Sequence, residues 1–309
     1  MNARWFDSIR SWIDEIGTPD STGDWLAPLN RLAARLDVRN HAGQPIRFVD
    51  AARIQPENYE LHIARNGSVP TRLDRAAAWH DYFNALAWLS FPRIKACLNR
   101  LQTEVIMQQQ LVTQPQVVTQ PQLDAVHSAR PGAPGRGPLR DAITLFDENA
   151  ALFVTRDAGI ARNLRDGRWQ QLFIGDRARF ASDARILLFG HALLHKLITP
   201  YKAICAHAWI VIVSDAQWRQ MRDGDQPAIA AIDAMVAAQL KAESIAGTLT
   251  PRSLMPLPVL GIPGWWPPND EPAFYNDAAV FRPPRTGAPR AGRRSVGPLA
   301  AHEARRSMS

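Results

Sequence analysis

WHDYFNAL, residues 79–86, predicts the helix around which the rest of the chain is organised. At about 100° per residue, Trp79, Phe83 and Leu86 fall on one face of this helix, which is therefore apolar. Pro92 can begin a helix but is not tolerated inside one, so a break is expected just before it. The stretch thus predicts two consecutive helices, the first of which buries a row of aromatic side chains.

Polar residues lie at the edge of that apolar face. His80 and Asn84 are four residues apart and share one flank of the predicted helix, and Asp81 points further round. A half-buried histidine beside an asparagine can be a metal ligand, a general base or a hydrogen-bonded core residue. The three alternatives stay open at this point.

Composition limits the class of protein. The chain has 309 residues, 46% of them hydrophobic, which is enough for one large core. Its two cysteines, Cys97 and Cys205, are far apart and form no disulfide framework, which is typical of a reducing compartment. No stretch approaches the roughly 18 consecutive apolar residues of a membrane helix. We therefore expect a soluble, cytoplasmic protein without a membrane span.

The positive charge is concentrated at the end of the chain. Residues 282–309 hold seven Arg and one Glu, which together supply +6 of the net charge of +7. The remainder is close to neutral, so the charge does not indicate a nucleic-acid-binding body. A basic, Pro/Gly-rich tail is usually disordered and solvated. The alternative is that this Arg-rich tail contacts nucleic acid or another anionic partner.

The remaining segments predict an α+β fold with a single domain. Residues 1–107 and 138–281 carry the apolar patterns that build a core. Between them, residues 108–137 contain the sequence VTQPQ twice and then a Pro/Gly/Arg run, which is typical of an exposed, disordered insert. Residues 282–309 form the basic tail, for which we also expect disorder.

Two short antiparallel hairpins are expected to form the β part, packed by several helices. Residues 59–65 alternate in polarity and are followed by Asn66-Gly67, a strong hairpin signal. Residues 143–147 and 151–155 suggest a second hairpin, with Asp147 and Glu148 next to its turn. Two adjacent acids at a turn are usually solvated; if they face inward, they become candidate ligands or an acid/base pair.

Another pair of candidate groups lies on a helix that is expected to follow a strand at residues 184–189. His191 and His195 are four residues apart, which is the spacing of a zinc-protease helix. Ala192 stands where that motif has its general-base Glu, so the protease interpretation fails. The sequence also has no Gly-x-Ser-x-Gly elbow and no Walker loop.

Four separated motifs resemble a known family. In chain order they are WHD followed by FNAL from Trp79, RD followed by LFDE from Arg140, FGHAL from Phe189, and PVLG followed by PGW from Pro258. Over most of residues 25–281 the chain resembles the bacterial family called domain of unknown function 3025. The resemblance implies no activity. It also implies that relatives usually carry Glu at the position of His195, which exchanges one ligand or base for another.

The candidate site gathers groups from distant segments. The candidate metal ligands are His80, His191, His195 and Glu148, with His207 and Asp147 as further members. Such a site needs three or more ligands at about 2.0–2.2 Å and partners for each imidazole, so a divalent metal is the candidate cofactor. The alternative is that these histidines are separate, hydrogen-bonded side chains.

Two functions remain. The first is an intracellular enzyme whose pocket gathers a set of residues for acid/base or metal-assisted chemistry: His80, Asn84, Asp147, Glu148 and His191. The second is a non-catalytic binding or assembly protein, whose polar cluster only orders the core and whose basic tail contacts an acidic partner. The first requires these side chains to converge at a place open to water; the second allows them to be scattered or sealed.

Overall fold

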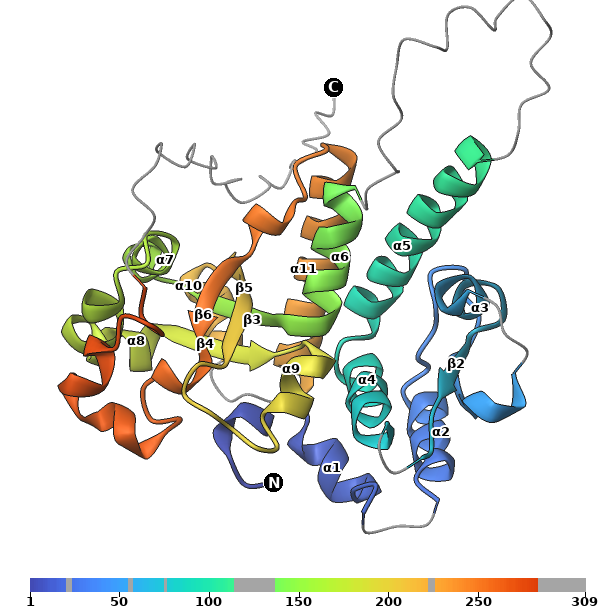
Figure 1. Ribbon diagram of the computed structural model, residues 1–309, viewed down its shortest axis with the longest axis horizontal. Coiled ribbons are helices and arrows are strands. Elements are labelled where there is room, and N and C mark those ends of the chain that lie inside the picture. Colours follow the sequence, from blue (N-terminus) through green and yellow to red (C-terminus); the bar gives the residue numbers. More distant parts are fainter. Residues whose placement is uncertain (21–23, 55–57, 75–76, 114–136, 222–225, 283–309) are drawn as a thin grey trace, which may run out of the picture.

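The central element of the computed structural model is a mixed four-stranded sheet (Figure 1). The structure describes all residues except 21–23, 55–57, 75–76, 114–136, 222–225 and 283–309. In spatial order the strands are β4 (Ala184–Leu188), β3 (Ala150–Thr155), β5 (Cys205–Ile212) and β6 (Met255–Pro258). β3 pairs antiparallel with β4 and parallel with β5, and β5 pairs antiparallel with β6.

Both faces of this sheet are covered. Every residue of β3 is buried, and its side chains alternate between two apolar clusters. Leu152 and Val154 face the cluster formed with α5 (Pro92–Thr113), α6 (Pro138–Asn149), α10 (Asp215–Met221) and α11 (Gln226–Ile245). Ala151 and Phe153 face the other cluster, which includes α1 (Arg10–Ile16), α4 (Ala78–Ser90) and α9 (His191–Lys196).

The remaining elements surround this core. The N-terminal part contains η1 (Arg4–Phe6), α2 (Leu26–Arg35), α3 (Tyr59–Asn66) and a parallel pair of strands, β1 (Arg47–Asp50) and β2 (Ser68–Thr71). α7 (Ala158–Arg165) and α8 (Arg177–Asp183) lie between β3 and β4 in the chain. Short turns of helix from Pro251 to Asn276 carry the chain back over the core. No described helix is both long and apolar enough to cross a membrane.

The central helix is confirmed. α4 runs from Ala78 to Ser90 and α5 begins at Pro92, so the break lies where proline predicts it. Phe83 and Leu86 have no exposed surface, and Trp79 packs beside Phe83 with a ring-centroid distance of 5.7 Å. The α+β class is confirmed as well, because a small sheet is packed by many helices.

The first predicted hairpin is wrong, because residues 59–66 form α3. The Asn58 side chain accepts hydrogen bonds from the backbone N–H groups of Glu60 and Leu61, as an N-cap does. Gly67 has φ +66° and ends the helix in the left-handed conformation. Both a tight hairpin turn and a helix C-cap need a positive φ, so Asn66-Gly67 suited either structure.

The second predicted hairpin is wrong in its first half only: the strand predicted at residues 151–155 is confirmed by β3, but the strand predicted before it is helical. Residues 138–149 form one helix, α6, which begins with Pro138 in its first turn and buries Ala142, Ile143 and Phe146 on one face. Asp147 and Glu148 therefore lie in the last turn of a helix, immediately before β3. The first residues of the predicted insert belong to α5, which continues to Thr113. Residues 114–136, like the tail from residue 283, lie outside the described part of the chain.

Candidate functional site

Three residues from three helices converge beside the sheet. His80 lies in the first turn of α4, Glu148 at the end of α6, and His191 at the start of α9. His80 Nε2 lies 3.8 Å from Glu148 Oε2, and His191 Nε2 lies 3.7 Å from Glu148 Oε1. One ligand atom from each residue lies within 4.8 Å of the others. Figure 1 shows that α9 lies next to both α4 and α6.

A carboxylate orients His80. Asp81 Oδ1 lies 3.0 Å from His80 Nδ1, which leaves Nε2 facing Glu148. Asp81 is held in turn by Arg72, whose backbone N–H and guanidinium donate three hydrogen bonds of 2.7 to 3.0 Å to the two carboxylate oxygens. A carboxylate behind an imidazole fixes its tautomer and raises its basicity, as is common behind metal-binding histidines.

His191 is arranged in a similar way but is more deeply buried. Only 4% of it is exposed, and its buried Nδ1 has no hydrogen-bond partner. The nearest carboxylate oxygen to Nδ1 is Asp147 Oδ2, at 3.9 Å. Gly190 allows this placement, because a Cβ there would lie 2.6 Å from the backbone nitrogen of Ala150. The approach of α9 to the junction of α6 and β3 therefore requires glycine at this position.

The pKa values of the two imidazoles shift in opposite directions. The pKa of His80 rises to about 9, because Asp81 and then Glu148 stabilise its cationic form. Burial lowers the pKa of His191 to about 4, so this ring is neutral at neutral pH. The pKa of Glu148 is lowered, chiefly by His80. In the metal-free protein at neutral pH, the three residues are thus one imidazolium, one neutral imidazole and one carboxylate.

A second set of polar groups lies behind the first. Lys95, of which 5% is exposed, donates to Asp147 Oδ1 at 2.6 Å and to Asn84 Oδ1 at 2.8 Å. Asn84 donates to the Tyr59 hydroxyl at 2.8 Å. Burial alone would raise the pKa of Asp147, but the charge and the hydrogen bond of Lys95 bring it below its usual value. Asp147 is therefore the ion-pair partner of Lys95 and also faces His191.

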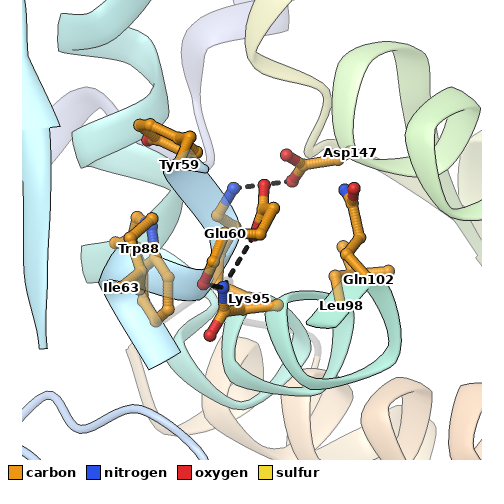
Figure 2. Close-up of a pocket in the computed structure, with 9 residues that line it drawn as sticks. Tyr59, Glu60, Ile63, Trp88, Lys95, Leu98, Gln102 and Asp147 are labelled. Atoms are coloured by element: carbon orange, nitrogen blue, oxygen red, sulfur yellow. Dashed lines mark hydrogen bonds and ion pairs between the residues drawn. The ribbon is translucent and has the colours of Figure 1, made fainter. Parts of the chain in front are cut away.

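Beyond Lys95 lies a small pocket between α3 and α5 (Figure 2). Its lining includes Glu60, Lys95, Asn99 and Asp147. Figure 2 shows the Lys95 ammonium directed at Asp147, with Glu60 beside it. The Asn99 amide donates to Glu60 Oε2 at 2.7 Å. Burial and the charge of Asp147 raise the pKa of Glu60 to about 7.

The structure brings together most, but not all, of the residues selected from the sequence. His80, Glu148 and His191 share one centre, while Asn84 and Asp147 belong to the layer behind it. His195 lies at the edge, with its ring centroid 6.4 Å from that of His80, and it is outside the group of three that can share an ion among the described residues.

His207 lies on β5, paired with Ala150 of β3, and is not part of that group of three either. Sequence reasoning missed Arg72, Lys95 and Glu60. Lys95 follows the buried Ile94 on α5, and a lysine next to an apolar stripe is usually solvated, so the sequence carries no signal that it is buried.

The donor set suits a divalent transition metal. Two imidazole nitrogens and one carboxylate are typical ligands of catalytic zinc, which keeps a fourth position for water or substrate. Bonds of about 2.1 Å in a tetrahedron place ligand atoms about 3.4 Å apart. The distances of 3.7 and 3.8 Å to Glu148 need only a small contraction to reach that value. A carboxylate that could accept a hydrogen bond from His191 Nδ1–H is also close, because Asp147 Oδ2 lies 3.9 Å from that atom.

The chain belongs to the family described as protein of unknown function, DUF3025, whose profile matches residues 46–285. The matched part includes His80, Glu148 and His191, together with all of the strands of the four-stranded sheet. No curated protein and no solved structure matches the chain. The family therefore carries no activity over to this site.

Proposed function

We propose that this protein is an intracellular, metal-dependent enzyme whose divalent ion is bound by His80, Glu148 and His191. The observation that carries the proposal is the convergence of these three ligand atoms within 4.8 Å, each from a different helix. Three protein ligands leave a coordination position for water, so the reaction class that we favour is metal-assisted activation of water, as in hydrolases. An intracellular location agrees with two cysteines that are both free.

The surroundings of the ligands support this assignment over a purely structural cluster. Asp81 lies behind His80 and Asp147 lies near His191, so each imidazole has a carboxylate on the side away from Glu148. Glu148 keeps 36% of its side chain exposed, so the centre is accessible from solvent.

Metal analysis of the purified protein tests the proposal. After reconstitution with zinc and removal of excess metal, we expect inductively coupled plasma mass spectrometry to find about one zinc ion per chain. Zinc at about 100 times its Kd should stabilise the fold by about 2.7 kcal/mol, which a thermal melt detects. The variants His191→Ala and Glu148→Gln should lose the ion.

His195→Ala provides a matched control, because His195 is a nearby histidine on the same short helix but outside the group of three. It should retain the ion with little change in affinity. A protein that binds no ion after reconstitution, and whose melting temperature is unchanged by zinc or by chelator, would contradict the proposal. The non-catalytic binding or assembly protein would then be the better explanation of the polar cluster.

A further inference from the structure

The pocket between α3 and α5 contains one more carboxyl group than it has cations. Glu60 and Asp147 both line it, and Lys95 is its one cationic side chain among the described lining residues. Lys95 binds Asp147 and Asn84, at 2.6 and 2.8 Å. Glu60 receives a hydrogen bond from the neutral Asn99 amide instead. Two buried carboxylates near one ammonium ion cannot both be ionised cheaply, so their proton affinities separate.

Two buried polar atoms of the described pocket residues have no hydrogen-bond partner. Asn99 Oδ1 and Trp88 Nε1 are buried without a hydrogen-bond partner, and their residues are 3% and 1% exposed. Each such group costs about 1–3 kcal/mol unless water or a ligand satisfies it. The pocket has room for about one water molecule. It therefore suits an ordered water and is too small for a substrate.

Asp147 connects this pocket to the candidate metal centre. One of its oxygens binds Lys95, and the other faces His191 Nδ1 at 3.9 Å. When His191 Nε2 binds a cation, its remaining proton lies on Nδ1, and Asp147 is the nearest carboxylate to accept it. The charged groups that face Glu60 are Lys95 from α5 and Asp147 from α6, with the Tyr59 hydroxyl beside it on α3. A cation at the centre adds positive charge on the His191 side of Asp147, the residue that the centre and the pocket share.

We propose that Glu60 is the proton-exchange residue of this site: near pH 7 it is part-protonated while the centre is empty, and it gives up that proton when a divalent cation binds. The O–H bond of the carboxylic acid breaks, and the proton passes to the pocket water and then to the buffer. The result is a carboxylate base beside an ordered water, formed only when the metal is present. This inference rests on the proposed metal site.

Calorimetric titration of the full chain with zinc, in buffers of different ionisation enthalpy, counts the protons released per ion. At pH 7, displacement of the His80 proton gives one, and Glu60, whose pKa is about 7, adds up to about half a proton. We expect Glu60→Gln, which keeps an acceptor for Asn99, to release about half a proton less than the wild type. The difference should vanish at pH 8.5, where Glu60 is already ionised.

Glu104→Gln is the matched control, because Glu104 lies on α5 with 53% of its side chain exposed. It should release as many protons as the wild type. If zinc binds but Glu60→Gln releases as many protons as the wild type at pH 7, the role of Glu60 is refuted while the metal site stands. If zinc does not bind, both proposals fail together. A thermal melt of each variant confirms that it is folded.

Discussion

Asp81 controls both the proton and the orientation of His80. The pKa of His80 is raised to about 9, first by Asp81 and then by Glu148. The folded protein therefore binds this proton more tightly than the unfolded chain, whose histidine pKa is about 6.5. The resulting stabilisation is complete below about pH 6.5 and is lost as the pH rises through about 9. In metal-free protein it amounts to on the order of 2 kcal/mol.

Asp81→Asn removes the negative charge but keeps the shape. We expect its unfolding free energy to fall less between pH 6.5 and 9 than that of the wild type, measured by urea denaturation with chelator present. Its affinity for zinc should drop about 10–100-fold, because the imidazole loses the carboxylate behind it. Asp141→Asn, at an exposed position of α6, should match the wild type in both measurements. Equal pH slopes for Asp81→Asn and the wild type would contradict the assigned role.

At the scale of the elements, the site depends on how closely α9 approaches the junction of α6 and β3. Gly190 precedes α9, and a Cβ there would lie 2.6 Å from backbone atoms of Asn149 and Ala150. Gly190→Ala should therefore push α9 away, cost about 1–3 kcal/mol of stability and weaken zinc binding. Gly137→Ala serves as the control, since its Cβ would meet open space. Chemical denaturation and zinc titration of the two variants measure both effects.

The same elements show what sequence reasoning could predict. α4 was predictable because its apolar face and its proline break are local features of residues 79–92. α3 was not, since the Asn66-Gly67 signal fits a hairpin turn or a helix end, and only packing decides between them. A Cβ at Gly67 would lie 2.4 Å from the backbone oxygen of Pro45, a contact that no local pattern reveals.

In the candidate site, too, some residues could be predicted from the sequence and others could not. His80 and His191 were identifiable as polar residues beside apolar helical faces. The residues that bind their neighbouring carboxylates were harder to predict from the sequence. Lys95 binds Asp147, which is 52 residues away in the chain, and Arg72 binds Asp81 from outside α4. Such pairs depend on tertiary packing, so a single sequence gives no periodic signal for them. The type of element mattered less, because Asp147 and Glu148 reach the site from a helix rather than from the predicted hairpin.

At the scale of the whole molecule, β3 joins the two apolar clusters, because successive side chains of this strand enter each in turn. The C-terminal segment then closes the cluster that contains Ala151 and Phe153. Phe281 is 6% exposed and lies 5.1 Å from Tyr275 between ring centroids. The Trp169 indole donates to the backbone oxygen of Arg282 at 2.7 Å, so the chain is part of the fold up to that residue.

Two truncations test where the folded body ends. A chain that stops at Arg282 keeps all of these contacts, and we expect its melting temperature to stay within about 2 °C of the full chain. A chain that stops at Glu271 loses two buried aromatic residues, Tyr275 and Phe281, together with the half-buried Phe274. Buried aromatic residues contribute about 3–5 kcal/mol each, against a total stability of about 5–15 kcal/mol, so this chain should not fold stably. Circular dichroism melts measure both.

The truncation at Arg282 also tests whether the basic tail contributes to anion binding rather than to stability. It removes six Arg and one Glu, so the net charge falls from +7 to +2. If the basic end contacts an anionic partner, the shortened protein should lose salt-sensitive binding to heparin while it keeps its melting temperature and its zinc. A large drop in melting temperature would instead mean that residues 283–309 stabilise the fold. Unchanged heparin binding would place the anion-binding charge on the folded body, where the sequence predicts near-neutrality.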